Sequence, residues 1–376
     1  MKRIWLSPPH MSGCELKYIN DAFDTNWIAP YGPNIDSFEH SIAKYIGIKN
    51  VTVVNSGTSA IHLALILLGV KHGDEVIIST FTFSGSVNPV MYQGATPIFV
   101  DSEKETWNIC PDLLESVIKK RLVKGKKPKA IILVHLYGMP ANLDRIMEIA
   151  DNFNIPVIED AAEALGSRFN NKFVGTFGKL GVFSFNGNKI ITTSGGGALV
   201  SNNTIYTNKA RFLATQARDK APHYQHSQIG YNYRMSNILA GIGLGQMEVL
   251  NERIRQRRSN FFYYLERLGD ISGIEFSVEP NNKYFSNRWL TTIIIDPSVA
   301  GATRNDLHSF MEKRNIETRP LWKPMHMQPV FSDCPAYLNG VSEELFEKGL
   351  CIPSGSNLSE GDLERVVSGI HACLQL

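Results

Sequence analysis

One segment, residues 181–201 with the sequence GVFSFNGNKIITTSGGGALVS, constrains this 376-residue chain more than any other. Its two apolar runs, GVFSF and GALVS, are typical of short buried strands, and Lys189 lies between them. An ammonium group among core strands is costly to bury unless it is paired, neutral or covalently modified. A Schiff-base lysine needs such a dry site. A solvated lysine on a surface hairpin is the alternative, and the segment alone does not decide between them.

Strands and helices alternate through the first half of the chain. The apolar β-branched runs predict strands over 51–54, 76–80, 97–101, 130–136 and 156–159. Helices are expected over 13–26, 35–46, 58–68, 84–92, 111–123 and 143–152. This alternation indicates βαβ units, a mainly parallel sheet and helices on both of its faces.

The pattern changes after residue 201. We expect helices over 204–216, 236–267, 304–314 and 359–374, with a strand over 291–296. Because the chain is too long for one ordinary domain core, two domains are expected. We place a large αβα domain at residues 1–245 and a smaller C-terminal α/β domain at residues 246–376.

Composition excludes several classes of protein. Hydrophobic residues make up 43% of the chain and charged residues 20%, as in soluble globular proteins. A net charge of +2 argues against nucleic acid or a membrane surface as a partner. The five cysteines are widely spaced without a C-x-x-C motif, so we expect neither disulfides nor a metal site. No signal peptide is recognisable, and a reducing cytoplasm fits.

Three features fall where predicted strands end, the edge at which open parallel sheets bind ligands. The first is the turn at residues 56–59, SGTS, whose amides and hydroxyls at a helix start suit a phosphate or serve as an ordinary N-cap. The second is Asp160, which either holds a protonated ring nitrogen or caps the next helix. The third is Phe83, which either stacks on a flat cofactor or belongs to the core. With Lys189, they are the parts that pyridoxal phosphate requires.

The chain resembles the pyridoxal-phosphate sugar aminotransferases of the DegT/DnrJ/EryC1/StrS family, which share the fold-type-I aspartate aminotransferase architecture. The stretches that carry the resemblance run nearly end to end: NSGTSAIHLAL, FTFSGSVNPV, GATPIFVD, HLYGMPANLD, IPVIEDAAEALGS, GTFGKLGVFSFNGNKIITTSGGGALV, YNYRMSNILAGIG and ETRPLWKPMH. Family relatives that dehydrate sugars carry histidine at the position of Lys189. A lysine there therefore implies transamination.

The resemblance implies a role for each matching residue. Lys189 binds the cofactor covalently and moves the proton, Asp160 pairs with the pyridine nitrogen, and Phe83 lies over the ring. The phosphate is held by Gly57, Thr58, Ser59 and Ser184, and by Asn232 of the neighbouring subunit, which makes the active unit a homodimer. Arg319 and His326 lie near the substrate.

Two further cofactor positions differ among members of the family. Asn186 stands where other members vary, and we expect it to contact the cofactor. Glu163 stands where many members have histidine or glutamine, on the cofactor's hydroxyl side. A glutamate at this position has to be protonated or to receive a hydrogen bond from the cofactor oxygen.

Within the family, LSPPHMSGCELKYI, NGNKIITTSGGG and ETRPLWKPMH are most similar to aminotransferases of the UDP-N-acetylbacillosamine pathway. This implies transfer of the amino group of L-glutamate to a nucleotide-linked 4-keto-6-deoxy sugar, UDP-2-acetamido-4-keto-2,4,6-trideoxyglucose. GDP-perosamine synthase and a 3-keto sugar aminotransferase are the enzymatic alternatives. A cofactor-binding regulatory protein without turnover is the alternative from another class.

Overall fold

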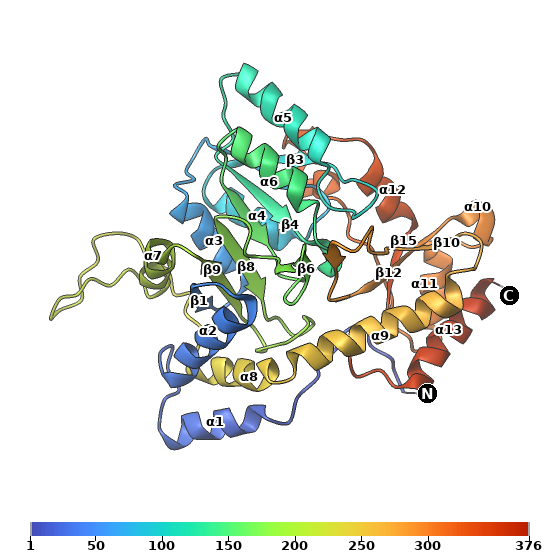
Figure 1. Ribbon diagram of the computed structural model, residues 1–376, viewed down its shortest axis with the longest axis horizontal. Helices are drawn as coiled ribbons and strands as arrows, with labels where there is room; N and C mark the ends of the chain where they lie inside the picture. Colours follow the sequence, from blue (N-terminus) through green and yellow to red (C-terminus); the bar gives the residue numbers. More distant parts are fainter. Residues whose placement is uncertain (1, 375–376) are drawn as a thin grey trace.

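An eight-stranded sheet forms the centre of the large domain in the computed structural model, which describes residues 2–374 (Figure 1). Strand β9 runs antiparallel to both of its neighbours, and every other neighbouring pair in the sheet is parallel. In order across the sheet the strands are β1 (Asn50–Val54), β9 (Gly197–Ser201), β8 (Leu180–Ser184), β5 (Val157–Asp160), β4 (Ala130–Val134), β2 (Glu75–Ser79), β3 (Thr96–Val100) and β14 (Ala336–Tyr337).

Helices cover both faces of this sheet because successive strand residues point to opposite sides. In β4, Ile131 and Leu133 pack into one core, and Ala130 and Ile132 pack into the other. The first core includes α2 (Pro33–Ile46), α5 (Pro111–Val123) and α6 (Leu143–Asn152). The second includes α3 (Gly57–Leu67), α4 (Ser84–Tyr92) and α7 (Thr204–Ala214). The predicted αβα architecture with a mainly parallel sheet is therefore confirmed.

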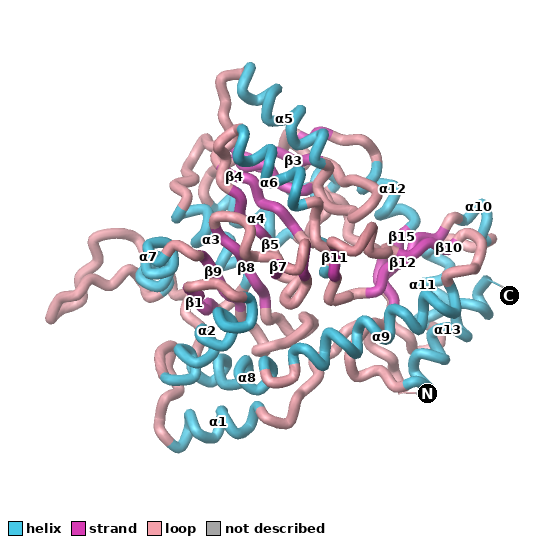
Figure 2. The backbone as a smooth tube through the Cα atoms, viewed as in Figure 1, coloured by secondary structure: helices cyan, strands magenta, loops and turns pink. Residues whose placement is uncertain are grey.

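The smaller C-terminal part is built on an antiparallel four-stranded sheet, at the right of Figure 2. Its strands, in order across the sheet, are β10 (Ile274–Phe276), β12 (Thr291–Ile295), β15 (Gly349–Ile352) and β13 (Arg319–Pro320). The helices of this part are α9 (Leu250–Leu268), α10 (Pro297–Ala300), α11 (Arg304–Glu312), α12 (Val341–Lys348) and α13 (Glu360–Leu374). Helix α9 extends from the side of the large sheet to this smaller sheet (Figure 1).

The helix predicted over 236–267 is two helices in the structure. Helix α8 (Asn237–Met247) packs against α1 (Glu15–Asp24) and α2, and α9 begins at Leu250 after a turn at residues 248–249. The prediction of one continuous helix was wrong. The turn carries no glycine or proline, so the sequence offers no local stop signal there.

Several segments pass between the two parts of the fold. Ile4 belongs to the core of the small domain, and β14 adds to the large sheet. A three-stranded sheet joins β11 (Tyr284–Phe285) to β6 (Arg168–Phe169) and β7 (Lys172–Phe173). The division at 245/246 stays a prediction, and segments from each side of it contribute to the sheets and core of the other side.

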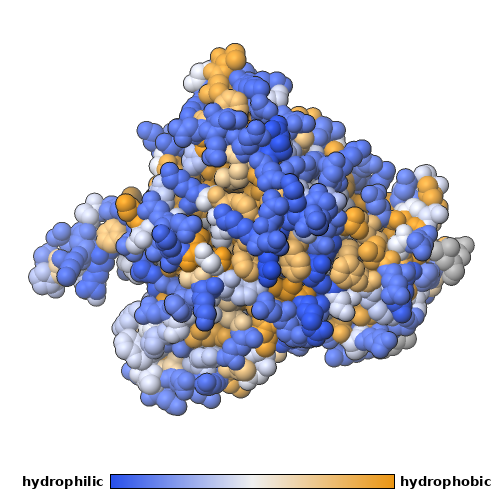
Figure 3. All heavy atoms as spheres, viewed as in Figure 1, coloured by the Kyte–Doolittle hydropathy of each residue, from blue (hydrophilic) through white to orange (hydrophobic). Residues whose placement is uncertain are grey.

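The face drawn in Figure 3 is mainly hydrophilic, with apolar atoms gathered at the tip of α5. Across residues 2–374, no helix combines the length and the apolar character needed to cross a membrane.

Candidate active site

A cavity of about 1000 Å³ lies where the strands of the large sheet end and the small domain begins. Its lining includes most of the residues that the sequence singles out, contributed by the ends of strands, the start of a helix and the C-terminal segment. These residues are Gly57, Thr58, Phe83, Asp160, Glu163, Ser184, Asn186, Lys189 and Arg319. Ser59, Asn232 and His326 are not among the lining residues.

The N-terminus of α3 forms the anion-binding end of the cavity. Ser56 is the N-cap, and its Oγ accepts a hydrogen bond of 3.0 Å from the amide of Ser59. The amides of Gly57 and Thr58 are therefore left at the open end of the helix, where the helix dipole favours an anion. A Cβ added to Gly85 would lie 3.0 Å from Thr58 Oγ1, so the absence of a side chain there leaves this end open.

Ser59 has a structural role in this turn. Its hydroxyl donates to Asn55 Oδ1 at 2.6 Å and lies 2.8 Å from Ser56 Oγ. Its amide is the one that Ser56 caps. The predicted contact between Ser59 and a phosphate stays a prediction, and the hydroxyls of Thr58 and Ser184 line the cavity directly.

The glycine run after Lys189 packs β9 closely against this turn. A Cβ on Gly197 would come within 2.5 Å of the Gly57 amide nitrogen, and a Cβ on Gly196 within 2.3 Å of Thr193 Oγ1. A Cβ on Gly195 would meet Asn55 O at an ordinary 3.9 Å. Close backbone packing beside the anion-binding end thus explains Gly197, whereas Gly196 is confined by neighbouring side chains and Gly195 by neither.

We expect Gly197→Ala to lower the free energy of unfolding by about 1–3 kcal/mol, because the new methyl group collides with backbone that has little room to move. Gly195→Ala is the matched control and should change the stability by less than about 0.5 kcal/mol. Urea unfolding of the two variants measures the difference. Equal stabilities would contradict the close packing of β9 on the turn before α3.

Asp160 is the last residue of β5, and its carboxylate is held from two sides at the cavity wall. Ser86 Oγ donates to Asp160 Oδ2 at 2.6 Å, and the amide of Ala162 donates to Oδ1 at 3.1 Å. Thr82 Oγ1 lies 2.8 Å from Ser86 Oγ and extends the chain of hydroxyls. Asp160 is only 5% exposed. A fixed, nearly buried carboxylate of this kind suits a protonated ring nitrogen.

Lys189 reaches the cavity from the turn between β8 and β9. Its side chain is 12% exposed, and Nζ lies 3.3 Å from Glu163 Oε1 and 4.0 Å from the ring centroid of Trp289. Nζ therefore stands over the indole face and beside a buried carboxyl group. The solvated hairpin lysine is thereby excluded, since Nζ lies between a buried carboxylate and an aromatic ring.

Glu163 is buried beside the lysine, and its Oε2 accepts a hydrogen bond of 2.7 Å from the amide of Tyr137. Burial raises the pKa of Glu163 to about 7, against the opposing effects of Lys189 and of the Tyr137 amide. Asp160 raises this pKa further. The carboxyl group is therefore available in its protonated form near neutral pH, which is one of the two states expected for a glutamate beside a cofactor oxygen.

This raised pKa predicts a pH-dependent stability for the cofactor-free protein. In the folded state Glu163 holds its proton up to about pH 7, whereas its ordinary pKa is 4.5. The contribution of Glu163 to the free energy of unfolding is complete below pH 4.5 and is lost as the pH rises through 7. The loss is on the order of 3 kcal/mol. Glu163→Gln does not titrate, so its melting temperature should rise relative to that of the original protein between pH 5 and pH 8. A pH-independent difference would contradict the raised pKa.

Two tryptophans from distant segments complete the wall, and no local sequence pattern predicts their place there. Trp289 and Trp322 line the cavity, and Tyr137 lies between them with ring centroids at 6.3 and 5.1 Å. Phe83, which is exposed, lies 5.5 Å from Trp322. In the sequence these two tryptophans stand in the runs NRWL and PLWKP, which show no helical or strand periodicity that would predict a position at the cavity.

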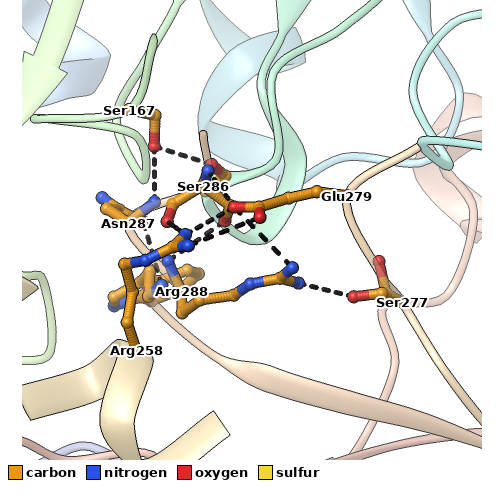
Figure 4. Close-up of polar contacts among 9 residues, drawn as sticks. Ser167, Arg258, Ser277, Glu279, Ser286, Asn287 and Arg288 are labelled. Carbon is orange, nitrogen blue, oxygen red and sulfur yellow. Dashed lines mark hydrogen bonds and ion pairs between the residues drawn. The ribbon is translucent and has the colours of Figure 1, made fainter. Parts of the chain in front are cut away.

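A partly buried polar cluster holds the segment that ends in Trp289. Figure 4 shows Arg258 and Arg288 on either side of Glu279. Arg258 also donates to the Ser286 carbonyl at 2.7 Å, and Glu279 accepts from the Ser286 amide at 2.7 Å. Arg288 has a φ of 52°, in the left-handed region. These contacts fix the chain immediately before Trp289 and so place the indole against Lys189.

Two predicted site residues lie elsewhere. His326 Nδ1 is 2.7 Å from Thr80 Oγ1, and its Nε2 is 3.0 Å from Glu343 Oε1. Asn232 is exposed and forms an isolated β-bridge with Thr215. The segment between α7 and α8, to which both residues belong, projects from the body at the left of Figure 1. The predicted substrate contact of His326 and the predicted contact of Asn232 with a partner's phosphate stay predictions.

The site contains each group that pyridoxal phosphate requires. The open N-terminus of α3 with Thr58 and Ser184 fits a phosphate, and the carboxylate of Asp160 fits the pyridinium nitrogen. Lys189 stands in the same cavity, and the space beside Gly85 would be reduced by any side chain. Fold and site together define the class of pyridoxal-phosphate-dependent aminotransferases.

Comparison with known proteins agrees with this class. The model of the DegT/DnrJ/EryC1/StrS aminotransferase family matches residues 9–371. EpsN of Bacillus subtilis (strain 168), assigned as a pyridoxal phosphate-dependent aminotransferase, is 52% identical over 370 residues, which are 97% of this chain and 94% of that protein. GDP-perosamine synthase of Escherichia coli O157:H7 is 38% identical over 374 residues, 99% of this chain and 98% of that protein. The crystal structure of the aminotransferase TlmJ from Streptoalloteichus hindustanus has a TM-score of 0.90 at 27% identity and covers 99% of both chains.

The chain belongs to the DegT/DnrJ/EryC1/StrS aminotransferase family. It is a pyridoxal-phosphate-dependent sugar aminotransferase with the fold expected of that family.

Proposed function

We propose that this enzyme transfers the amino group of L-glutamate to a nucleotide-linked 4-keto-6-deoxy sugar, with UDP-2-acetamido-4-keto-2,4,6-trideoxyglucose as the substrate. L-Glutamate leaves as 2-oxoglutarate, and the product is the 4-amino sugar. The observation that carries the substrate class is the cavity of about 1000 Å³, at the upper end of the range for small-molecule sites. It leaves room for a large substrate beside the cofactor. The resemblance to bacillosamine-pathway enzymes supports the particular sugar.

Pyridoxal phosphate, when bound, supplies the electron-withdrawing ring that stabilises charge at the reacting carbon. Asp160 keeps the ring nitrogen protonated, while Gly57, Thr58 and Ser184 bind the phosphate. Lys189 Nζ takes a proton from the substrate carbon and returns one, as a general base and acid within reach of the reacting atoms. The other cofactor-binding residues in this proposal are Ser59, Phe83, Glu163, Asn186 and Asn232.

GDP-perosamine synthesis is the second candidate, because GDP-perosamine synthases are full-length relatives of this chain at 35–38% identity. Perosamine is also a 4-amino-6-deoxy sugar, so the two candidates differ in the nucleotide and in the substituents of the sugar. Both candidate reactions would use the same cofactor-binding residues around Lys189.

We also propose that the active unit is a homodimer and that it works in the cytoplasm. The segment between α7 and α8 projects from the body (Figure 1). Its apolar side chains Tyr224 and Ile229 are exposed. Docking of this segment on a second copy would bury them and carry Asn232 toward the partner's cavity. The five cysteines are free, as expected in a reducing compartment.

A turnover panel tests the proposal. The cofactor-loaded enzyme is supplied with L-glutamate and with UDP-, GDP- or dTDP-linked ketosugars, and 2-oxoglutarate release and product mass are measured. We expect the UDP-linked 4-keto sugar to give the highest kcat/KM. Preference for the GDP-linked sugar would support perosamine synthesis instead. Bleaching by glutamate without amination of any 4-keto nucleotide sugar would contradict the substrate class.

A further inference from the structure

Trp5 is an exposed tryptophan at the edge of the active-site cavity. It lines the cavity although 52% of its surface is exposed. The guanidinium of Arg3 lies 4.9 Å from its ring centroid, and Arg3 Nη2 donates to both carboxylate oxygens of Glu312 at 2.9 Å. The indole is thus held by a fixed cation and still has about half of its surface free. Such a ring is a platform for a planar aromatic group.

Arg319 lines the same cavity, and 66% of its side chain is exposed. Its Nε and Nη2 donate to Glu317 Oε1 at 3.0 and 2.9 Å. Within residues 2–374, Arg319 Nη1 makes no hydrogen bond, so its N–H groups remain available to an anion. A planar guanidinium held along one edge suits the oxygens of a phosphate.

The carboxylate of Glu317 ties these two residues to each other. Its Oε2 accepts a hydrogen bond of 2.9 Å from the amide of Leu6, next to Trp5, while its Oε1 holds Arg319. The Glu317 amide donates to the Ile4 carbonyl at 2.9 Å. The N-terminal segment and the start of β13 therefore form one unit that presents an aromatic ring and a cation together.

Trp5 and Arg319 belong to the exposed part of the cavity lining, whereas Asp160 and Glu163 in the same lining are each only 5% exposed. The anion-binding group at the N-terminus of α3 is made of neutral amides and hydroxyls, whereas the exposed part of the lining has the guanidinium of Arg319, paired along one edge with Glu317. The cavity thus has two places for phosphate, of different chemistry.

We propose that Trp5 and Arg319 form the subsite for the nucleoside diphosphate part of the sugar substrate, with the indole stacked on the base and the guanidinium paired with the diphosphate. This inference rests on the proposed function of a nucleotide-sugar aminotransferase. It makes Trp5 and Arg319 the residues that recognise the nucleotide, while the groups near Lys189 act on the sugar.

Calorimetric titration of the cofactor-loaded enzyme with UDP, GDP, dTDP and inorganic pyrophosphate tests the subsite. With the tightest nucleotide, Trp5→Ala should raise Kd about 5- to 150-fold, the range that base stacking gives. It should leave the pyrophosphate Kd unchanged, and Trp5→Phe should retain most of the affinity. Arg319→Gln should raise the Kd of both ligands about 10- to 150-fold, and Arg319→Lys should raise it less. Trp27→Ala, at the other exposed tryptophan, is the matched control and should bind as the original enzyme does.

Nucleotide binding that is unchanged in Trp5→Ala and Arg319→Gln would overturn the subsite. So would a rise in the KM for L-glutamate in Arg319→Gln without a rise in nucleotide Kd, since the guanidinium would then serve the amino donor. If nucleotides bind as expected but no ketosugar is turned over, the proposed function fails and the subsite stands. If a ketosugar is turned over while binding is independent of both residues, the subsite alone fails.

Discussion

Lys189→Ala should remove nearly all transamination activity. The lost proton transfer alone should lower kcat/KM by about 10²- to 10⁴-fold. Nζ is the amine that stands in the cavity, 3.3 Å from Glu163 and over Trp289. The variant should also lose the visible absorbance of the lysine-bound cofactor. The fold should survive, because Glu163 without its partner cation becomes protonated and neutral. Steady-state kinetics and absorption spectra of the purified variant measure both effects.

Lys179→Ala is the matched control for this experiment. Lys179 is an exposed lysine immediately before β8, the strand that leads to Lys189, and it lies outside the cavity lining. Its removal should leave kinetics and spectrum unchanged. Small primary amines such as methylamine should restore part of the activity of Lys189→Ala, because the truncated side chain leaves space for an amine. A Lys189→Ala enzyme with near-normal turnover would show that another group moves the proton.

Asp160→Asn should lower kcat by roughly 10²- to 10³-fold, the usual cost of removing one fixed electrostatic group from an active site. The amide keeps the shape of the carboxylate and can still bond to Ser86 and Ala162, but it has no charge to hold a protonated ring nitrogen. The melting temperature of the cofactor-free variant should therefore change little, while kcat falls.

Ser86→Ala gives a graded comparison for Asp160→Asn. It removes the 2.6 Å hydrogen bond to Asp160 Oδ2 and leaves the carboxylate in place, so the loss should be about 10-fold or less. Equal losses in the two variants would mean that the orientation of the carboxylate, not its charge, is what matters. An Asp160→Asn enzyme within 10-fold of the original would contradict the role of Asp160.

Much of the large domain follows from local sequence patterns. The predicted helices 84–92 and 111–123 have the observed bounds of α4 and α5, and the central strands are correct to within two residues at either end. Buried strands of a parallel sheet are continuous apolar runs, so their pattern is visible without knowledge of their neighbours. The break at residues 248–249 was missed because the packing of α8 on α1 and α2, not a helix-stopping residue, sets its position.

The candidate site could be predicted only in part. Asp160 and Lys189 were found because strand ends and a lysine between apolar runs are local features. Trp289 and Trp322 were not, since tertiary packing alone brings them to the wall. Trp5 shows the same limit: its place at the cavity depends on the hydrogen bond between Leu6 and Glu317, which are more than 300 residues apart in the sequence. No periodicity or motif reports such a contact.

Mass-spectrometric peptide mapping of the cofactor-loaded enzyme, after borohydride has made the lysine–cofactor bond permanent, tests the central claim most directly. We predict the added pyridoxyl phosphate mass on the peptide that contains Lys189 and on no other lysine. A modified lysine elsewhere, with Lys189 unmodified, would contradict the assignment of this cavity as the transamination site.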